Sequence, residues 1–130
     1  MKAETADYLN KARTTLADAT KISTLPLPLV AAREAYLAVF HAAEAYIFEC
    51  TDKVAKSHRG VRIEFNRLAR SEPRIGHDLV TFLTTAYQFK QRADYGIDPS
   101  AAPLSPTEAT AAINTAERFI DTISQILPPD

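Results

Sequence analysis

Hydrophobic residues recur at intervals of three and four along most of the chain, which is the repeat of an α-helix. The first such series predicts a helix from about Glu4 to Lys21, and its members are Leu9, Ala12, Leu16 and Ala19. The segment that follows contains Pro26 and Pro28, which disfavour helix from Ile22 onwards.

A second helix is predicted from near Leu29 to Cys50, and it is the longest in the chain. Its hydrophobic stripe consists of Leu29, Tyr36, Phe40, Ala43, Ile47 and Cys50. At 1.5 Å per residue the helix would be roughly 33 Å long, about the width of a small domain. We therefore expect it to be the central element, with a turn over residues 51–53.

Three further helices follow, each marked by a start or stop signal. Ser57 is predicted to be the N-cap of a short third helix, which Pro73 stops. A fourth helix is predicted from Gly76 to Gly96. The fifth begins at Ser105-Pro106-Thr107-Glu108, a capping box with proline at the first helical position, and runs to about Leu127.

The pattern predicts an all-α fold, since no run of β-branched residues with a period of two occurs. We expect an antiparallel up-and-down helical bundle of four main helices plus one shorter helix. The chain has 130 residues, of which 46% are hydrophobic, so residues 1–130 are expected to form a single domain.

Composition excludes several classes of protein. No stretch approaches the roughly 20 apolar residues that cross a bilayer, and the N-terminus carries an acid where a signal peptide is apolar. The single cysteine, Cys50, excludes an intramolecular disulfide framework and a cysteine zinc site. We expect a soluble, cytoplasmic protein with no membrane partner.

Charge is divided along the chain although the formal net charge is only −1. From Lys53 to Arg74 there are seven basic residues against two acids, and from Asp94 to Asp130 six acids against one basic residue. Arginine binds phosphates well, so the basic segment from Lys53 to Arg74 can form an RNA-facing surface, made of Lys56, Arg59 and Arg62. It can equally be a solvated face, or one that docks on the acidic third of this chain or a partner.

Arg33 falls on the hydrophobic stripe of the second helix, where an unpaired guanidinium would be costly. We expect a partner for it, and Asp94 is the preferred candidate. One interpretation is an arginine that bridges two helices, and the other is an anion-binding arginine at a helix interface.

The histidines give no metal motif. His41 and Glu44 are three residues apart, but a carboxylate-bridged metal bundle needs Glu-x-x-His motifs, which this chain lacks. We therefore expect no metal and no cofactor, and a hydrogen-bonded His41 near the bundle surface.

Three segments carry recognisable motifs. Residues 33–43 have the pattern R-x-x-Y-x-x-x-F-H-A-A. Residues 56–61, Lys56-Ser57-His58-Arg59-Gly60-Val61, together with Phe65 have the pattern K-x-H-x-G-V-x-x-x-F, and Arg92-Ala93-Asp94-Tyr95-Gly96 is similar to the pattern R-x-x-D-Y-G. Together they resemble the HEPN family (higher eukaryotes and prokaryotes nucleotide-binding), in its small stand-alone prokaryotic branch.

The resemblance implies a bundle of four main helices plus a short one, commonly dimeric. It also implies a toxin–antitoxin or related defence system, often with a nucleotidyltransferase partner. Some members are metal-independent RNases that use an Arg and a His with four to six residues between them. Arg70 and His77 have that spacing, whereas Arg92-Ala93-Asp94-Tyr95, where the motif usually lies, has no His.

These observations lead to three hypotheses. The first is a non-catalytic HEPN-type module that binds a nucleotide-like ligand or a nucleotidyltransferase partner, through Arg33, Tyr36, His41, Arg92, Asp94 and Tyr95. The second is a metal-independent RNase toxin with Arg70 and His77 as catalytic residues. The third is a purely structural dimerisation module, in which the polar cluster fixes the register of the helices.

Overall fold

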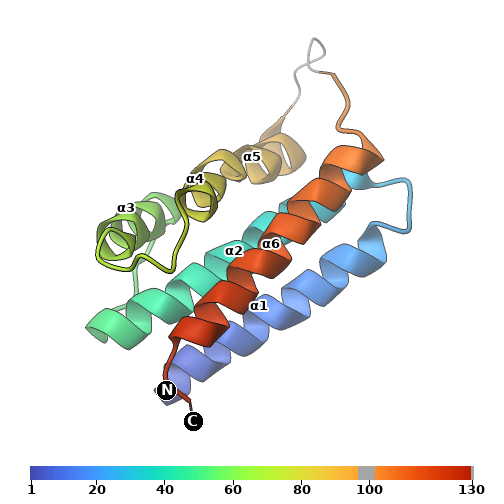
Figure 1. The fold of residues 1–130 in the computed structure, drawn as a ribbon. Helices are drawn as coiled ribbons and strands as arrows, with labels where there is room; N and C mark the ends of the chain where they lie inside the picture. The colour runs from blue at the N-terminus through green and yellow to red at the C-terminus, as the bar shows by residue number, and fades with distance from the viewer. Residues whose placement is uncertain (97–101, 130) are drawn as a thin grey trace.

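The computed structural model describes residues 1–96 and 102–129 of the chain, and over these residues it is all-helical. Its elements are α1 (Ala3–Ile22), α2 (Pro28–Thr51), α3 (His58–Ala69), α4 (His77–Thr85), α5 (Tyr87–Tyr95) and α6 (Pro106–Ile126). In Figure 1, α1 and the α4–α5 arm run in one direction and α2 and α6 in the other, with α3 in the α2–α4 connection. The predicted all-α up-and-down bundle is therefore confirmed.

The predicted fourth helix is one arm with a break in it. It divides into α4 and α5 at Ala86, which is buried. The Phe89 amide donates to the Ala86 carbonyl at 3.0 Å, a tighter turn than the α-helical one. Neither proline nor glycine lies near this break, so its cause is tertiary: α4 packs on α3 and α6, and α5 packs on α2.

Both predicted N-caps are confirmed. The Gly60 amide donates to Ser57 Oγ at 2.9 Å and starts α3. At α6 the Glu108 amide donates to Ser105 Oγ at 3.1 Å, while the Ser105 amide donates to Glu108 Oε1 at 3.2 Å, which completes the capping box. A Cβ at residue 60 would lie 3.0 Å from Ser57 Oγ, so Gly60 leaves space for its own cap.

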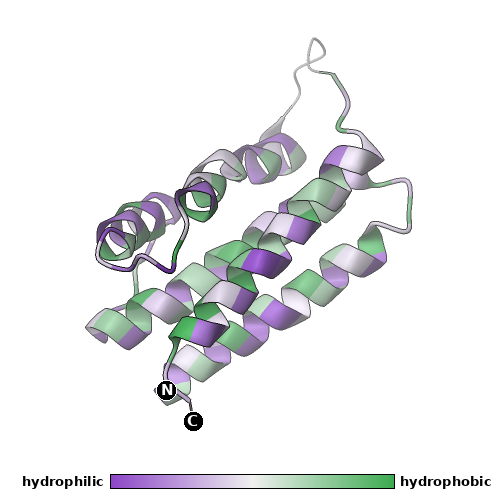
Figure 2. Cartoon of the chain, in the orientation of Figure 1, coloured by the Kyte–Doolittle hydropathy of each residue, from purple (hydrophilic) through white to green (hydrophobic). Residues whose placement is uncertain are grey.

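Helix α2 is the central element, as predicted. It packs against α1, α3, α5 and α6, and Figure 2 shows it as largely hydrophobic while α3 and α5 carry more hydrophilic residues. Seven of its alanines are fully buried: Ala31, Ala32, Ala35, Ala38, Ala42, Ala43 and Ala45. Because a methyl group takes up so little room, these alanines allow the neighbouring helices to approach α2 closely.

Thr5 is a buried polar residue whose Oγ1 has no hydrogen-bond partner among the described residues. A hydroxyl buried without a partner costs about 1–3 kcal/mol in proteins. We expect Thr5→Val to raise the free energy of unfolding by about 1 kcal/mol, because valine keeps the shape and removes the hydroxyl. Thermal and urea denaturation measure this. Thr14→Val, on the exposed side of the same helix, is the matched control, and an equal gain there would attribute the effect to something other than burial.

Candidate functional site

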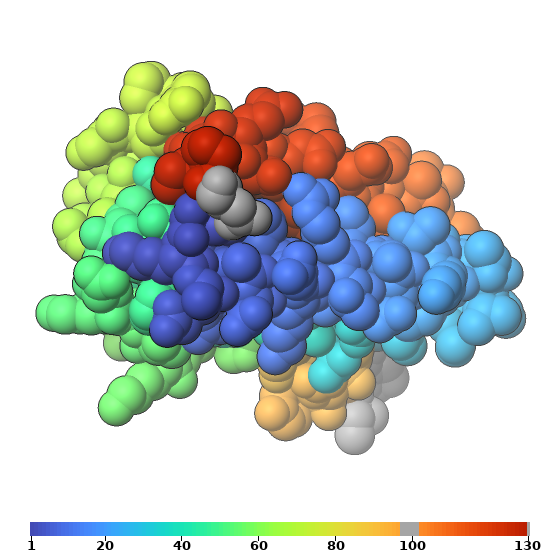
Figure 3. Space-filling model, turned by 90° about the horizontal axis from the view of Figure 1, so that it is seen from below, coloured from blue at the N-terminus to red at the C-terminus, as the bar shows by residue number. Residues whose placement is uncertain are grey.

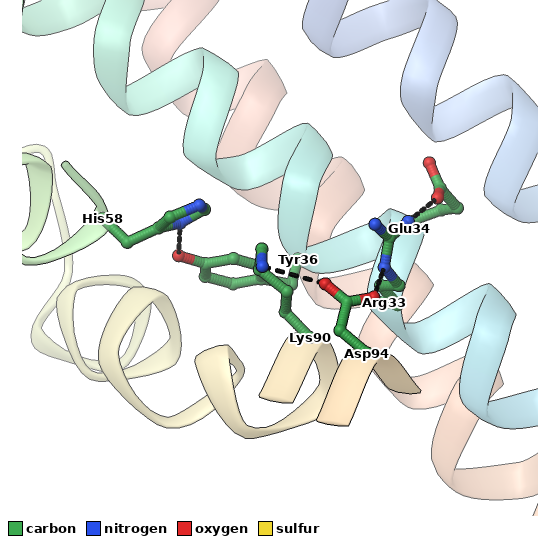
Figure 4. A network of polar contacts seen from close by, with 6 residues as sticks. All are labelled: Arg33, Glu34, Tyr36, His58, Lys90 and Asp94. Carbon is green, nitrogen blue, oxygen red and sulfur yellow. Dashed lines mark hydrogen bonds and ion pairs between the residues drawn. The ribbon is translucent and has the colours of Figure 1, made fainter. Parts of the chain in front are cut away.

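An ion-pair network joins α2 to α5. Arg33 Nε donates to Asp94 Oδ1 at 2.7 Å and Arg33 Nη1 donates to Glu34 Oε1 at 2.7 Å. Lys90 Nζ donates to the second oxygen of Asp94 at 2.9 Å, so both oxygens of this carboxylate are used (Figure 4). The prediction that Arg33 meets Asp94 is confirmed. The hydrogen bonds from Lys90 and Arg33 hold the pKa of the Asp94 carboxyl below its usual range.

Every charge in this network is paired, because its two cations bind its two carboxylates. Arg33 is partly buried, and both of its carboxylate partners lie within the chain. This geometry matches the interpretation of Arg33 as an arginine that bridges two helices. An incoming anion would have to displace Asp94 or Glu34 to reach the guanidinium.

A second polar contact joins α2 to the start of α3. The hydroxyl of Tyr36, which is fully buried, forms a hydrogen bond of 2.8 Å with Nδ1 of His58 (Figure 4). The His58 ring stacks on Phe40 and Tyr87, with ring centroids 4.3 and 5.3 Å away. His58 therefore holds α3 against both α2 and α5.

The surroundings of His58 favour its neutral form. Burial lowers the pKa of His58 below its ordinary value of 6.5, and the positive charges of Lys90 and Arg62 add to this, while Glu44 opposes them. Burial raises the pKa of Tyr36, although the positive charge of Arg62 opposes this, so the hydroxyl keeps its proton in the hydrogen bond that it shares with the neutral imidazole. His58 was not among the candidates singled out from the sequence. Its position directly after the Ser57 cap, inside the K-x-H-x-G-V segment, was the available signal.

The three basic residues predicted to face RNA are in different environments. Lys56 and Arg59 are exposed. Arg62 is half-buried, and its guanidinium carbon lies 4.5 Å from the centroid of the Tyr87 ring. Its Nη1 is buried with no hydrogen-bond partner among the described residues. The guanidinium contacts the aromatic ring and also lies close enough to the Tyr36 hydroxyl to oppose the rise in the pKa of Tyr36. Arg62 thus attaches α3 to α5, while Lys56 and Arg59 face solvent.

Arg70 and His77 line the same hollow, although seven positions separate them in the chain. The hollow has a volume of about 470 Å³ and is lined by Asn66, Ala69, Arg70, Glu72, Pro73, Ile75, His77 and Val80. Both Arg70 and His77 are exposed. Glu72, the one acid in the lining, is paired with Arg74 through two hydrogen bonds of 2.9 Å.

The remaining predicted ligand-binding residues make contacts of their own that do not include Arg33. His41 Nδ1 and Glu44 Oε1 form a hydrogen bond of 2.8 Å, with both side chains largely buried. Arg92 Nη2 donates to the Ala102 carbonyl at 3.0 Å. Tyr95 is 75% exposed at the end of α5, and Lys90 Nζ lies 5.4 Å from its ring centroid. Within residues 1–96 and 102–129, no three His, Cys, Asp or Glu side chains form a group that could hold a metal ion.

The fold and these contacts define the class of protein as an all-α bundle whose helices are joined by polar and aromatic contacts. The sequence matches the HEPN domain over residues 5–126, so the chain belongs to the HEPN domain family, a family of nucleotide-binding and RNase modules. A comparison with curated proteins found no match. In the described part of the chain, every helix falls short of the combined length and hydropathy that a bilayer crossing requires.

The lowered pKa of His58 predicts that the stability of the fold depends on pH in a specific way. Because its pKa is lower in the folded chain than in the unfolded chain, the unfolded state binds the proton first as the pH falls. The stabilisation is therefore fully present above about pH 6.5 and is lost as the pH falls from there through the folded-state pKa. We expect His58→Gln to flatten this part of the stability profile, measured by urea denaturation at a series of pH values. His77→Gln, at an exposed histidine, should keep the slope, and a slope unchanged in His58→Gln would contradict the assignment.

Proposed function

We propose that this chain is a non-catalytic HEPN-type module that binds the phosphate groups of a nucleotide or of RNA on the outer face of α3. The observation that carries the proposal is a set of exposed cations with no counter-charge. Arg59 and Arg70 form no ion pair with any residue that the structure describes, and the same holds for Lys56 before the helix. Arginine at a solvent-exposed face is well suited to phosphate oxygens.

The spacing along α3 gathers these donors on one face. Arg59, Asn66 and Arg70 are separated by seven and four residues, so they lie on one side of the helix. Asn66 and Arg70 also line the hollow that His77 closes from α4. A phosphate bound in the hollow would meet one arginine, one amide and one imidazole. Arg59 lies 11 residues before Arg70, about 16 Å along the helix, so it would contact a different phosphate of the same ligand.

The acidic third of the chain does not neutralise this face. Asp94 is bound by Arg33 and Lys90, Asp121 lies 3.9 Å from Arg13, and Glu108 completes the cap of α6. Glu117 forms no ion pair with a residue that the structure describes. Asp98 and Asp130 lie outside the described residues. The alternative in which the basic segment docks on the acids of the same chain therefore has little support from these contacts.

Binding is tested with fluorescence anisotropy on a labelled single-stranded RNA and, separately, a fluorescent ATP. We expect Arg59→Ala and Arg70→Ala each to weaken binding several-fold. On RNA, each variant should also lower the slope of log K against log salt by about 0.7 for every phosphate that it no longer neutralises. The RNA and ATP arms show whether the phosphates belong to a nucleic acid or a nucleotide.

Arg67→Ala is the matched control on the same helix, because Arg67 is already paired with Glu64. It should bind like the wild type. Equal weakening in all three variants, or unchanged binding in Arg59→Ala and Arg70→Ala, would overturn the proposal. Circular dichroism verifies that each variant is folded.

A second candidate is a metal-independent RNase, and one observation favours it: Arg70 and His77 line a single hollow. An imidazole can transfer protons near neutral pH and an arginine can stabilise a phosphate anion. The purified chain would then cleave RNA in the presence of EDTA, and Arg70→Ala and His77→Ala would each abolish cleavage. Arg74→Ala, whose guanidinium is paired with Glu72, should cleave normally. Cleavage that survives in either of the first two variants would exclude this pair as the catalytic centre.

We extend the proposal to the biological setting implied by the family resemblance: a toxin–antitoxin or defence-like pair with a nucleotidyltransferase partner. The closed network of Arg33, Glu34, Lys90 and Asp94 would then keep α5 in place while the partner binds. The same resemblance favours a second copy of the chain as a partner.

A further inference from the structure

An open groove lies at the corner between α2 and α3, and we call it the corner groove. It has a volume of about 320 Å³, and three of its lining residues are apolar: Ile47, Val54 and Ala55. Lys53 and Glu64 are the charged residues in its lining. In Figure 3 the green chain between α2 and α3 forms the left-hand edge of the molecule and projects from it.

Two large hydrophobic side chains are exposed at this groove. Val54, in its lining, is 51% exposed, and Ile63 on α3 is 55% exposed. Ile63 lies three residues after Gly60 and directly before Glu64, which both line the groove, so its side chain stands at the edge of the groove. Exposed aliphatic side chains that gather beside a hollow are typical of protein association sites.

The surroundings of the groove carry a net positive charge. Three exposed basic residues in the segments around it form no ion pair with any residue that the structure describes: Lys53, Lys56 and Arg59. The nearby acids are already paired, since Glu64 accepts two hydrogen bonds from Arg67 and Asp52 lies 2.8 Å from Lys2 Nζ. The free cations therefore favour an acidic partner.

The combination of groove and cations matches an acidic protein segment that carries one apolar anchor. Protein interfaces combine a buried apolar centre with a polar rim, and opposite charges on the two rims favour the correct partner. Anchor side chains contribute most when they fill a preformed pocket. The corner groove supplies the apolar centre, and the basic residues around it supply a positive rim.

Nucleic acid matches the corner groove less well than protein. Within the described residues, no aromatic side chain lines the groove, so a base would have no ring to stack on. A phosphate backbone would use the cations and leave Val54 and Ile63 in water. A second copy that docked through the same face would bring like charges together, which is unfavourable.

We propose that the corner groove binds an acidic segment of another protein, with one apolar side chain of that segment seated between Val54 and Ile63. Carboxylates on either side of this anchor would pair with the basic residues of the rim, Lys53, Lys56 and Arg59.

The corner groove and the phosphate-binding face of α3 share one residue, Arg59. An acidic segment bound at the groove would therefore compete with RNA for this guanidinium. Arg70 and His77 line a separate hollow. The proposal for the groove therefore does not rest on phosphate binding.

The test is fluorescence anisotropy of two fluorescein-labelled acidic peptides with the full chain. Both peptides consist of glutamates around one central residue, which is leucine in one peptide and serine in the other. We expect the wild type to bind the leucine peptide about 10-fold tighter or more, because the leucine side chain leaves water in the groove. Val54→Ser and Ile63→Ser should each reduce this preference by about 3-fold or more.

Leu25→Ser is the matched control. Leu25 is 53% exposed, but it lies before α2, whereas the groove follows the last turn of that helix. This variant should keep the wild-type preference for leucine, and circular dichroism verifies that each variant is folded. Equal affinity of the wild type for the two peptides, or an unchanged preference in both Val54→Ser and Ile63→Ser, would contradict the proposal.

The same variants separate the other occupants. Val54→Ser and Ile63→Ser should bind labelled RNA as the wild type does, and weaker RNA binding there would assign the groove to nucleic acid instead. Sedimentation with vesicles of phosphatidylserine and phosphatidylcholine that is lost in these variants would assign it to a membrane surface, and either result rejects the proposal. If Arg59→Ala and Arg70→Ala leave RNA binding unchanged while the leucine preference stands, only the phosphate site is wrong.

Discussion

A helix buried on several sides must find a partner within the chain for each polar side chain that it carries, and α2 is such a helix. Its buried alanines allow α1 and α6 to approach closely, which leaves little water along its length. Arg33, Tyr36 and His41 on this helix are therefore each matched, to Asp94, His58 and Glu44. Two of these three partners come from α5 and α3, so the hydrogen bonds that the polar side chains of α2 require determine where those helices pack.

This constraint divides the basic side chains into those that have a partner within the bundle and those that have none among the described residues. The residues that contact α2 or α5 are used internally: Arg33 and Lys90 by Asp94, and Arg62 by the ring of Tyr87. The cations that point away from the bundle, Arg59 and Arg70, have no such partner among the described residues. This contrast is the reason that the proposed phosphate site is on the outer face of α3 and not among the motif residues of α2 and α5.

Local signals in the sequence were sufficient for the helix starts at Ser57 and Ser105, because a cap depends on residues within one turn. The pair of Arg33 and Asp94 was also predictable, since a guanidinium on an apolar stripe requires a carboxylate.

Other features depend on distant residues, which no local pattern reveals. Arg62 shares a helix with Arg59, yet Tyr87 of another helix covers it. The break between α4 and α5 at Ala86 is not marked by a proline or a glycine in the sequence. His58 joins the helices only because Phe40 and Tyr87, from other parts of the chain, stack on its ring. Arg70 and His77 are only seven positions apart, but their spacing alone does not show that the segment between α3 and α4 places both side chains at one hollow.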